Sequence, residues 1–124
     1  MRQLILATLL TTLGTTAMAE DNPLWLRYPA ISPDGKTVAF AYRGDIFTVP
    51  TNGGTAKQIT SNSAFDSYPV WSPDGSHIAF ASNREGSMDV WVMDADGGVP
   101  HRITTNSGNE LPLKWLNDNT VLFK

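Results

Sequence analysis

The hydrophobic positions of this chain fall in short runs separated by groups of Gly, Pro, Asp, Asn and Ser. In Val38-Ala39-Phe40-Ala41, and again in Ile78-Ala79-Phe80-Ala81, bulky and small side chains alternate. Because successive side chains of a β-strand point to opposite faces, each run presents bulky residues on one face and alanines on the other. Neither face is polar, so we predict strands that neighbouring sheets bury on both sides.

The longest repeated segment runs from Tyr28 to Phe40 and returns, almost unchanged, from Tyr68 to Phe80. Both copies begin Tyr-Pro, continue through Ser-Pro-Asp-Gly and end Ala-Phe. The copies are 40 residues apart here and 44 apart further on, so the second copy contains an insertion of four residues. We expect this insertion to form a turn at Asn83-Arg84-Glu85-Gly86. A repeat of about 40 to 45 residues is typical of one four-stranded blade of a β-propeller.

Turn chemistry divides each copy into four strands. In Ser72-Pro73-Asp74-Gly75, Pro fixes φ, the Asp side chain can bond the backbone of the turn, and Gly tolerates positive φ. Asn-Gly or Asp-Gly pairs later in each copy favour tight hairpins. The sequence therefore predicts consecutive antiparallel hairpins, with the strands of the second copy at Tyr68–Ser72, His77–Ser82, Asp89–Met93 and Val99–Thr104.

A third copy, which matches the repeat less well, begins at Pro112 and stops at Lys124. The predicted fold class is therefore all-β, a partial β-propeller with two four-stranded antiparallel blades and the start of a third. Because propellers have about four blades or more, we expect the chain to be the N-terminal piece of a larger protein or a truncated copy of one. The expected units are a signal peptide at 1–19, a lead-in at 20–27, blade 1 at 28–60, blade 2 at 68–104 and an incomplete blade 3 at 112–124.

The first residues have the pattern of a secretory signal peptide. Arg2 gives a positive start, Leu4 to Leu13 is mostly apolar, and Ala17-Met18-Ala19 is a small-x-small cleavage site. The apolar run is shorter than the roughly 20 residues of a membrane span. We predict cleavage after Ala19 and export to the bacterial periplasm or medium, with no membrane attachment after cleavage.

Composition narrows the range of partners. The net charge is −3, so no basic surface favours nucleic acid. The chain has no Cys, which excludes disulfides and thiolate chemistry. Gly and Pro are frequent, with 10 and 8 residues, as expected for many strands joined by tight turns.

Candidate chemical residues are few, and each has a simpler structural interpretation. We interpret His77 and His101 as surface or cross-strand polar residues, because neither has metal ligands at a suitable spacing. Asp94-Ala95-Asp96-Gly97 resembles the start of a calcium loop but lacks the distal Glu, which favours a turn. Ser32 and Ser72 precede Pro in tight turns without a nucleophile elbow. We therefore predict no catalytic, cofactor-binding or metal-binding residue in this chain, and no peptidase activity.

The tryptophans and one charged hairpin are the remaining candidates. Three tryptophans lie at equivalent or inward strand positions, which favours packing between blades over a binding belt; they are Trp71, Trp91 and Trp115. Trp25 lies outside the repeat, and both interpretations stay open for it. Arg84 and Glu85 are expected at the tip of a hairpin, exposed to solvent, where a partner contact also stays possible.

The order Ser-Pro-Asp-Gly, Ile/Val-Ala-Phe, Asp-x-x-x-Val, Gly-Gly and Ile-Thr resembles the WD40-like repeats of TolB and tricorn propellers. The resemblance covers Tyr28 to Lys124. TolB-like proteins carry an α/β domain ahead of the propeller, and the first repeat here begins too early for one. The lead-in from Asn22 to Pro29 is similar to the opening of bacterial, exported tricorn-like serine peptidases.

That resemblance implies a function. In tricorn-like peptidases the propellers gate and guide peptides, and the catalytic residues lie in a C-terminal module with no counterpart in this chain. The leading hypothesis is thus the non-catalytic N-terminal propeller of an exported serine peptidase, a hydrolase. Alternatives are a TolB-like binding propeller of the cell envelope and the propeller cap of a prolyl-oligopeptidase-type enzyme. The expected partners are a peptide or protein substrate and the remaining blades and catalytic module of the parent chain. Association with a second copy of the chain stays open.

Overall fold

The structure, a computed structural model, describes residues 25–124, and every regular element in this range is a β-strand. The predicted signal peptide at 1–19 and most of the lead-in lie outside the described residues. No helix in the described range is long and apolar enough to cross a membrane.

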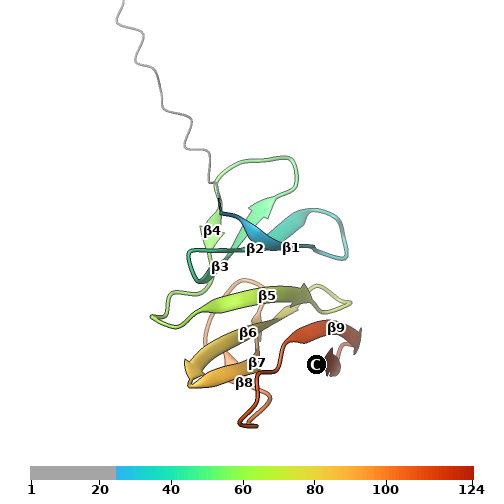
Figure 1. The fold of residues 1–124 in the computed structure, drawn as a ribbon. Helices are drawn as coiled ribbons and strands as arrows, with labels where there is room; N and C mark the ends of the chain where they lie inside the picture. Colours follow the sequence, from blue (N-terminus) through green and yellow to red (C-terminus); the bar gives the residue numbers. More distant parts are fainter. Residues whose placement is uncertain (1–24) are drawn as a thin grey trace, which may run out of the picture.

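The strands form three antiparallel sheets, each in sequence order (Figure 1). Blade 1 contains β1 (Arg27–Ile31), β2 (Thr37–Tyr42), β3 (Asp45–Pro50) and β4 (Lys57–Gln58). Blade 2 contains β5 (Asp66–Trp71), β6 (His77–Glu85), β7 (Ser87–Asp94) and β8 (His101–Arg102). The third sheet contains β9 (Pro112–Asn117) and β10 (Thr120–Phe123). This arrangement confirms the predicted partial propeller of two four-stranded blades and the start of a third.

The Ser-Pro-Asp-Gly turns behave as their chemistry predicts. In blade 1 the Gly35 N–H donates to the Ser32 carbonyl at 2.8 Å, and in blade 2 Gly75 donates to Ser72 at 2.9 Å. Gly35 and Gly75 have φ values of 72° and 74°, a region that favours glycine. Each turn therefore closes the hairpin between the first and second strand of its blade.

The four inserted residues extend a hairpin. The Gly86 N–H donates to the Asn83 carbonyl at 3.0 Å, so a turn does lie at the predicted place. However, β6 continues to Glu85, which pairs with Ser87 at the start of β7. The insertion thus lengthens both inner strands of blade 2 and carries residue 84 into the sheet.

The outermost strands are much shorter than predicted. Val99–Thr104 was expected as a strand, but β8 covers only His101–Arg102. Pro100 has no N–H to donate to a ladder, which limits pairing on its side. Beyond β8, the Thr104 side chain replaces a backbone acceptor, because its Oγ1 accepts a hydrogen bond from the Val90 N–H at 2.9 Å. Short outer strands also leave little unpaired edge exposed.

The core lies between the two blades, as the alternation of bulky and small residues predicts. The small side chains of β2 and β6 are buried, with Ala39, Ala79 and Ala81 each at 0 % exposure. Phe80 is fully buried among Ile46, Ile78 and Met93. Burial of one such large apolar side chain stabilises the fold by about 1.5–3 kcal/mol.

An unusual backbone conformation recurs at the start of each blade. Tyr28 and Tyr68 both have φ of 53°, a left-handed conformation that is uncommon for tyrosine. Both lie where the pairing register shifts, at a bulge in β1 and in β5. Their rings stack with centroids 3.9 Å apart, so the bulges bring the first strands of the two blades together.

Candidate functional site

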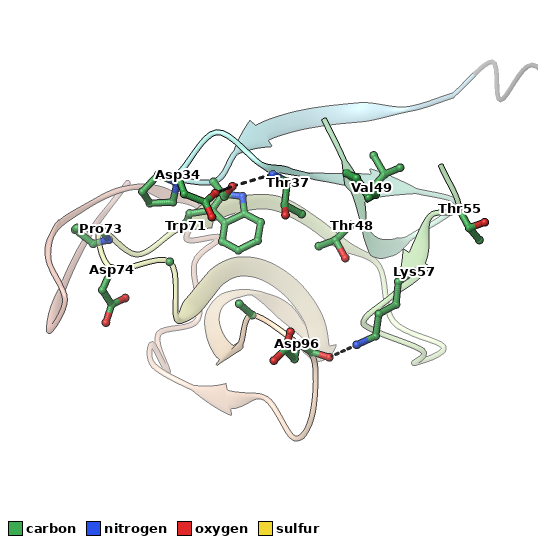
Figure 2. A pocket seen from close by; sticks show the side chains of 15 residues that line it. Asp34, Thr37, Thr48, Val49, Thr55, Lys57, Trp71, Pro73, Asp74 and Asp96 are labelled. Carbon is green, nitrogen blue, oxygen red and sulfur yellow. Dashed lines mark hydrogen bonds between the residues drawn. The ribbon is translucent and has the colours of Figure 1, made fainter. Parts of the chain in front are cut away.

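A cleft of about 730 Å³ opens between blade 1 and blade 2 (Figure 2). It lies at the end of the blades that carries the Ser-Pro-Asp-Gly turns. Blade 1 contributes Asp34, Thr48 and Lys57, and blade 2 contributes Trp71, Asp74 and Asp96. We call this the interblade cleft. It combines one large aromatic side chain with a mostly acidic rim.

Trp71 ties the two blades together beside the cleft. Its Nε1–H donates to the Ala30 carbonyl of β1 at 2.9 Å. The same contact recurs at the next junction, where Trp115 Nε1–H donates to the Val70 carbonyl at 3.1 Å. Packing between blades, predicted for these two tryptophans, is therefore confirmed. A ligand in the cleft would meet a Trp71 ring whose polar edge is already occupied.

Hydrogen bonds within the Ser-Pro-Asp-Gly turns stabilise the charged form of the rim carboxylates Asp34 and Asp74. The Ser72 Oγ–H and the Ser76 Oγ–H each donate to Asp74 Oδ1 at 2.7 Å, and the Ser76 N–H donates at 2.9 Å. With the Ser76 backbone N–H as the largest cause, these bonds lower the pKa of Asp74 to about 2. The Ser32 hydroxyl and the Lys36 N–H likewise lower the pKa of Asp34. Both carboxylates carry negative charge at neutral pH.

The opposite rim is a contact between blades. Lys57 Nζ of β4 donates to the Asp96 carbonyl at 2.8 Å, as Figure 2 shows. Asp96 belongs to the turn after β7, which the Gly97 N–H closes onto the Asp94 carbonyl at 2.9 Å. A side chain at Gly97 would approach the Ile59 carbonyl within 3.4 Å, so this turn packs directly on blade 1. The segment that resembled a calcium loop thus forms a hairpin turn.

The two serines of the repeat lie inside their turns. Each hydroxyl donates to the Asp two residues later, at 2.6 Å for Ser32 and 2.7 Å for Ser72. Each also accepts a backbone N–H, from Thr37 at 3.0 Å and from His77 at 2.9 Å. These bonds explain why Ser precedes Pro in both copies.

The structure brings a serine, a histidine and an aspartate together that the sequence analysis did not group. The Ser76 Oγ lies 2.7 Å from His77 Nδ1, and His77 Nε2 lies 3.4 Å from Asp94 Oδ1. In β6 and β7, His77 and Asp94 are cross-strand partners, as the interpretation of His77 suggested. The Asp94 side chain is 77 % exposed, unlike the buried aspartate that orients a catalytic histidine. Ser76 also donates to Asp74, so its hydroxyl supports the turn.

No metal site is evident in the described part of the chain. Residues 25–124 contain no group of three or more His, Asp or Glu side chains placed to hold an ion. His101 is exposed on β8.

The expectation that Arg84 is solvated is wrong. Its side chain is only 11 % exposed, and its Nη2 donates to both oxygens of Asp66, at 3.1 and 2.9 Å. Its guanidinium also lies 4.8 Å from the Trp91 ring centroid. The longer hairpin of blade 2 folds Arg84 back onto the sheet, where it neutralises the fully buried carboxylate of Asp66. Glu85, in contrast, is exposed.

A second buried ion pair also escaped the sequence analysis. Arg102 Nη2 lies 2.8 Å from Oδ2 of the fully buried Asp89. At the equivalent position of blade 1, Gln58 Nε2 donates to Asp45 Oδ2 at 3.0 Å. The recurrence of Asp in both copies was the available signal, because a carboxylate at a buried repeat position requires a partner.

The other two tryptophans differ in environment. Trp91 is 7 % exposed and belongs to the core, so it is a packing residue. Trp25 is 65 % exposed, and the Arg27 guanidinium lies 5.5 Å from its ring centroid. Trp25 is thus available to a ligand at the other end of blade 1.

Residues 23–124 match the family model of the tricorn protease N-terminal β-propeller domain. The chain belongs to this family. No match is found among curated proteins.

Solved structures share the fold. Putative TolB from Agrobacterium tumefaciens has a TM-score of 0.70 and 24 % identity, over 80 % of this chain and 41 % of that one. TolB from Acinetobacter baumannii has a TM-score of 0.65 and 26 % identity, over 73 % and 24 %. The apo AtxE2 isopeptidase has a TM-score of 0.61 and 22 % identity, over 77 % and 19 %. The chain therefore spans less than half the length of these proteins.

Proposed function

We propose that this chain is the N-terminal propeller portion of an exported tricorn-like serine peptidase, in which it binds and guides peptides without cleaving them. The observation that carries the proposal is the family match over residues 23–124. The interblade cleft supports it, because a cavity of about 730 Å³ is large enough for a short peptide segment.

The cleft chemistry favours a cationic peptide. Asp34, Asp74 and Asp96 contribute three carboxylates, while the one lysine of the lining, Lys57, is bonded to the Asp96 carbonyl. The Trp71 ring offers an apolar surface for the aliphatic part of a Lys or Arg side chain. Charges at an exposed rim mainly affect association and specificity, so the affinity of this chain alone should be modest.

Binding of a labelled Lys-rich peptide to the full chain tests the cleft. Asp96→Asn removes a rim charge whose side chain forms no hydrogen bond within the described residues, so the fold should be unaffected. We expect about a threefold loss of affinity, corresponding to about 0.6 kcal/mol for an exposed charge pair. Glu85→Gln removes an exposed charge outside the cleft and serves as the matched control. Equal affinity of both variants would count against the cleft as the peptide site.

The same samples test the absence of catalysis. We expect no turnover of casein or of short chromogenic peptides, because the hydroxyl of Ser76 is bonded within its turn and Asp94 is exposed. Turnover that disappears in Ser76→Ala would refute a purely guiding role.

Export belongs to the same proposal. The order of Arg2, the apolar run and Ala17-Met18-Ala19 supports a signal peptide. N-terminal sequencing of the exported protein should begin at Glu20, and a product that retains Met1 would contradict export by this route.

A second candidate function is that of a TolB-like binding propeller without a peptidase. The two TolB structures, with TM-scores of 0.70 and 0.65, favour it. The coding sequence downstream of Lys124 distinguishes the two candidates. A serine peptidase module there supports the first, and a propeller followed directly by a stop codon supports the second.

A further inference from the structure

A second pocket, of about 280 Å³, lies at the opposite end of blade 1 from the interblade cleft. It is formed by the start of β1, the tight turn between β2 and β3, and the connection to blade 2. Four aromatic residues and two arginines define it, and we call it the aromatic pocket: Trp25, Arg27, Tyr28, Tyr42, Arg43 and Phe65.

Within residues 25–124, the two arginines of this pocket have no acidic partner. The ion pairs of this part of the chain involve His77, Arg84 and Arg102 as the cationic groups, and neither Arg27 nor Arg43 lies within 4.0 Å of one of its carboxylates. Instead, each lies against an aromatic ring, with Arg27 5.5 Å from the centroid of Trp25 and Arg43 5.2 Å from that of Tyr42. Such stacking orients a guanidinium and leaves its N–H groups free for a ligand.

Two acidic residues that lie next to pocket residues in the sequence have other partners. Asp45, which follows the turn, accepts a hydrogen bond from Gln58 at 3.0 Å. Asp66, which follows Phe65, is fully buried and paired with Arg84. Two positive charges in a chain of net charge −3 are thus concentrated at one exposed pocket.

Backbone strain also concentrates here. Among the described residues, three non-glycine residues have positive φ, and two of them, Tyr28 and Arg43, line this pocket with φ of 53° each. The two-residue turn at Arg43 and Gly44 requires positive φ, and the bulge at Tyr28 recurs at Tyr68, so both conformations belong to the blade architecture that positions the pocket residues. The neighbouring Gly44, at φ of 89°, lets Phe65 approach, since a Cβ there would lie 3.4 Å from the Phe65 ring.

Two large apolar side chains at the pocket remain exposed. Trp25 is 65 % and Phe65 is 49 % exposed. Phe65 is nevertheless fixed, because its N–H donates to Asn83 Oδ1 at 2.7 Å. An exposed aromatic side chain beside an orienting arginine is a combination enriched at protein interfaces.

We propose that the aromatic pocket binds an acidic peptide segment, with an Asp or Glu carboxylate between Arg27 and Arg43 and the adjacent apolar residue against Trp25 and Phe65. The pocket volume is suited to about one side chain, so we expect the pocket to recognise a short peptide motif. This inference rests on the proposed role in peptide binding but uses a different site and the opposite charge.

Fluorescence anisotropy of a labelled peptide with the full chain tests it. The probe is Gly-Ser-Phe-Glu-Ser-Gly, and the same peptide with Gln in place of Glu is the matched control. We expect the Glu peptide to bind about tenfold more tightly, as a charge-assisted contact implies. Equal binding of the two peptides, or binding of neither, would overturn the proposal.

Three variants locate the contact. Arg43→Asn keeps a residue that tolerates positive φ, and Arg27→Gln changes a strand position without that constraint. Each should weaken binding of the Glu peptide about tenfold while leaving the circular dichroism spectrum unchanged. Lys36→Gln removes an exposed charge at the other end of the blade and should have no effect. If Arg27→Gln is folded and binds like the wild type, the proposal is wrong.

A fourth variant separates this site from the interblade cleft. Asp96→Asn should weaken binding of the Lys-rich peptide and leave binding of the Glu peptide unaffected. If Asp96→Asn does not weaken binding of the Lys-rich peptide while Arg27→Gln still weakens binding of the Glu peptide, the aromatic pocket is supported and the assignment of the interblade cleft as a peptide site is wrong.

Discussion

The ion pair between Asp66 and Arg84 gives the sharpest test of how blade 2 is stabilised. Arg84→Met keeps an unbranched, flexible side chain over the Trp91 and Phe80 rings but removes the guanidinium. The Asp66 carboxylate, at 0 % exposure, then has no cationic partner within the described residues. Removing one partner of a buried pair costs about 3–5 kcal/mol.

The expected magnitude lies at the lower end of that range. The Arg84 side chain is 11 % exposed, so some water reaches the site and can solvate the orphaned carboxylate. The lost cation–π contact with Trp91, at 4.8 Å, contributes about 0.5–1 kcal/mol more. We expect a loss of about 3 kcal/mol in the free energy of unfolding, a large share of the roughly 5–15 kcal/mol typical of a domain.

A double variant distinguishes the orphaned charge from lost packing. Blade 1 carries Leu26 at the repeat position of Asp66, which suggests Asp66→Leu as the apolar substitute. If the buried charge causes the loss, Asp66→Leu combined with Arg84→Met should recover about 2 kcal/mol over Arg84→Met alone.

Urea unfolding, followed by circular dichroism, measures both variants. The midpoint should fall for Arg84→Met and rise again for the double variant, with the m-value unchanged. The reasoning is refuted if Arg84→Met costs less than about 1 kcal/mol, a value typical of an exposed pair. It is also refuted if the double variant is no more stable than the single one.

Three further predictions concern the blade junctions, the turns and the exposed faces. Trp71→Phe removes the indole N–H that bonds the Ala30 carbonyl and should lower the free energy of unfolding by about 1–2 kcal/mol. The control Trp25→Phe, at an exposed position, should change it by less than about 0.5 kcal/mol. Similar effects of both variants in urea unfolding would contradict a stabilising role of the Trp71 hydrogen bond. The pKa of Asp74 is depressed to about 2 in the folded chain, so its stabilising contribution is present above the unfolded pKa of about 4 and is lost as pH falls toward about 2. Melting temperatures across this window should fall less steeply for Asp74→Asn than for the wild type, and parallel curves would show that the turn contributes nothing. Leu116 and Leu122 of the third sheet are 56 % and 41 % exposed, and Ile31 of blade 1 is 66 % exposed, so the chain should self-associate with concentration in light scattering. Leu116→Lys should reduce this association, and a wild-type monomer at every concentration would contradict it.

The sequence predicted the parts of the fold that depend on local chemistry. Tight turns at Ser32 and Ser72 follow from Pro, Asp and Gly at fixed positions, and the buried strands follow from alternation of bulky residues with alanine. The Trp71 and Trp115 contacts were predicted as packing, although the carbonyl acceptors could not be named. Those acceptors lie more than 40 residues earlier in the chain, and only the stacking of blades brings them close.

The ion pairs and the aromatic pocket were not predictable in the same way. Arg84 was assigned to an exposed tip because an insertion between strands usually forms a loop. Its burial depends on Asp66, which preceded the predicted start of the strand at Tyr68. The aromatic pocket combines the start of β1, the end of β2, the turn that follows it and the connection to blade 2, and the periodicity of a single strand does not show which of these segments meet.

The backbone hydrogen bonds explain why Asp66 was missed, and they place the start of the repeating structure earlier than the Tyr-Pro pattern does. The Asp66 N–H donates to the Gly44 carbonyl at 2.7 Å, and the Glu110 N–H donates to the Met88 carbonyl at the same distance. The spacing of 44 residues makes Asp66 and Glu110 equivalent: each is a buried acid where a first strand leaves the previous blade. An acid at this position joins two blades through its backbone, and the side chain of Asp66 is neutralised by Arg84, whereas Glu110 has no cationic partner among the described residues. The conspicuous Tyr-Pro pattern begins two residues after Asp66. A repeat that is defined from Tyr68 onward therefore leaves Asp66 outside the blade to whose first strand it belongs.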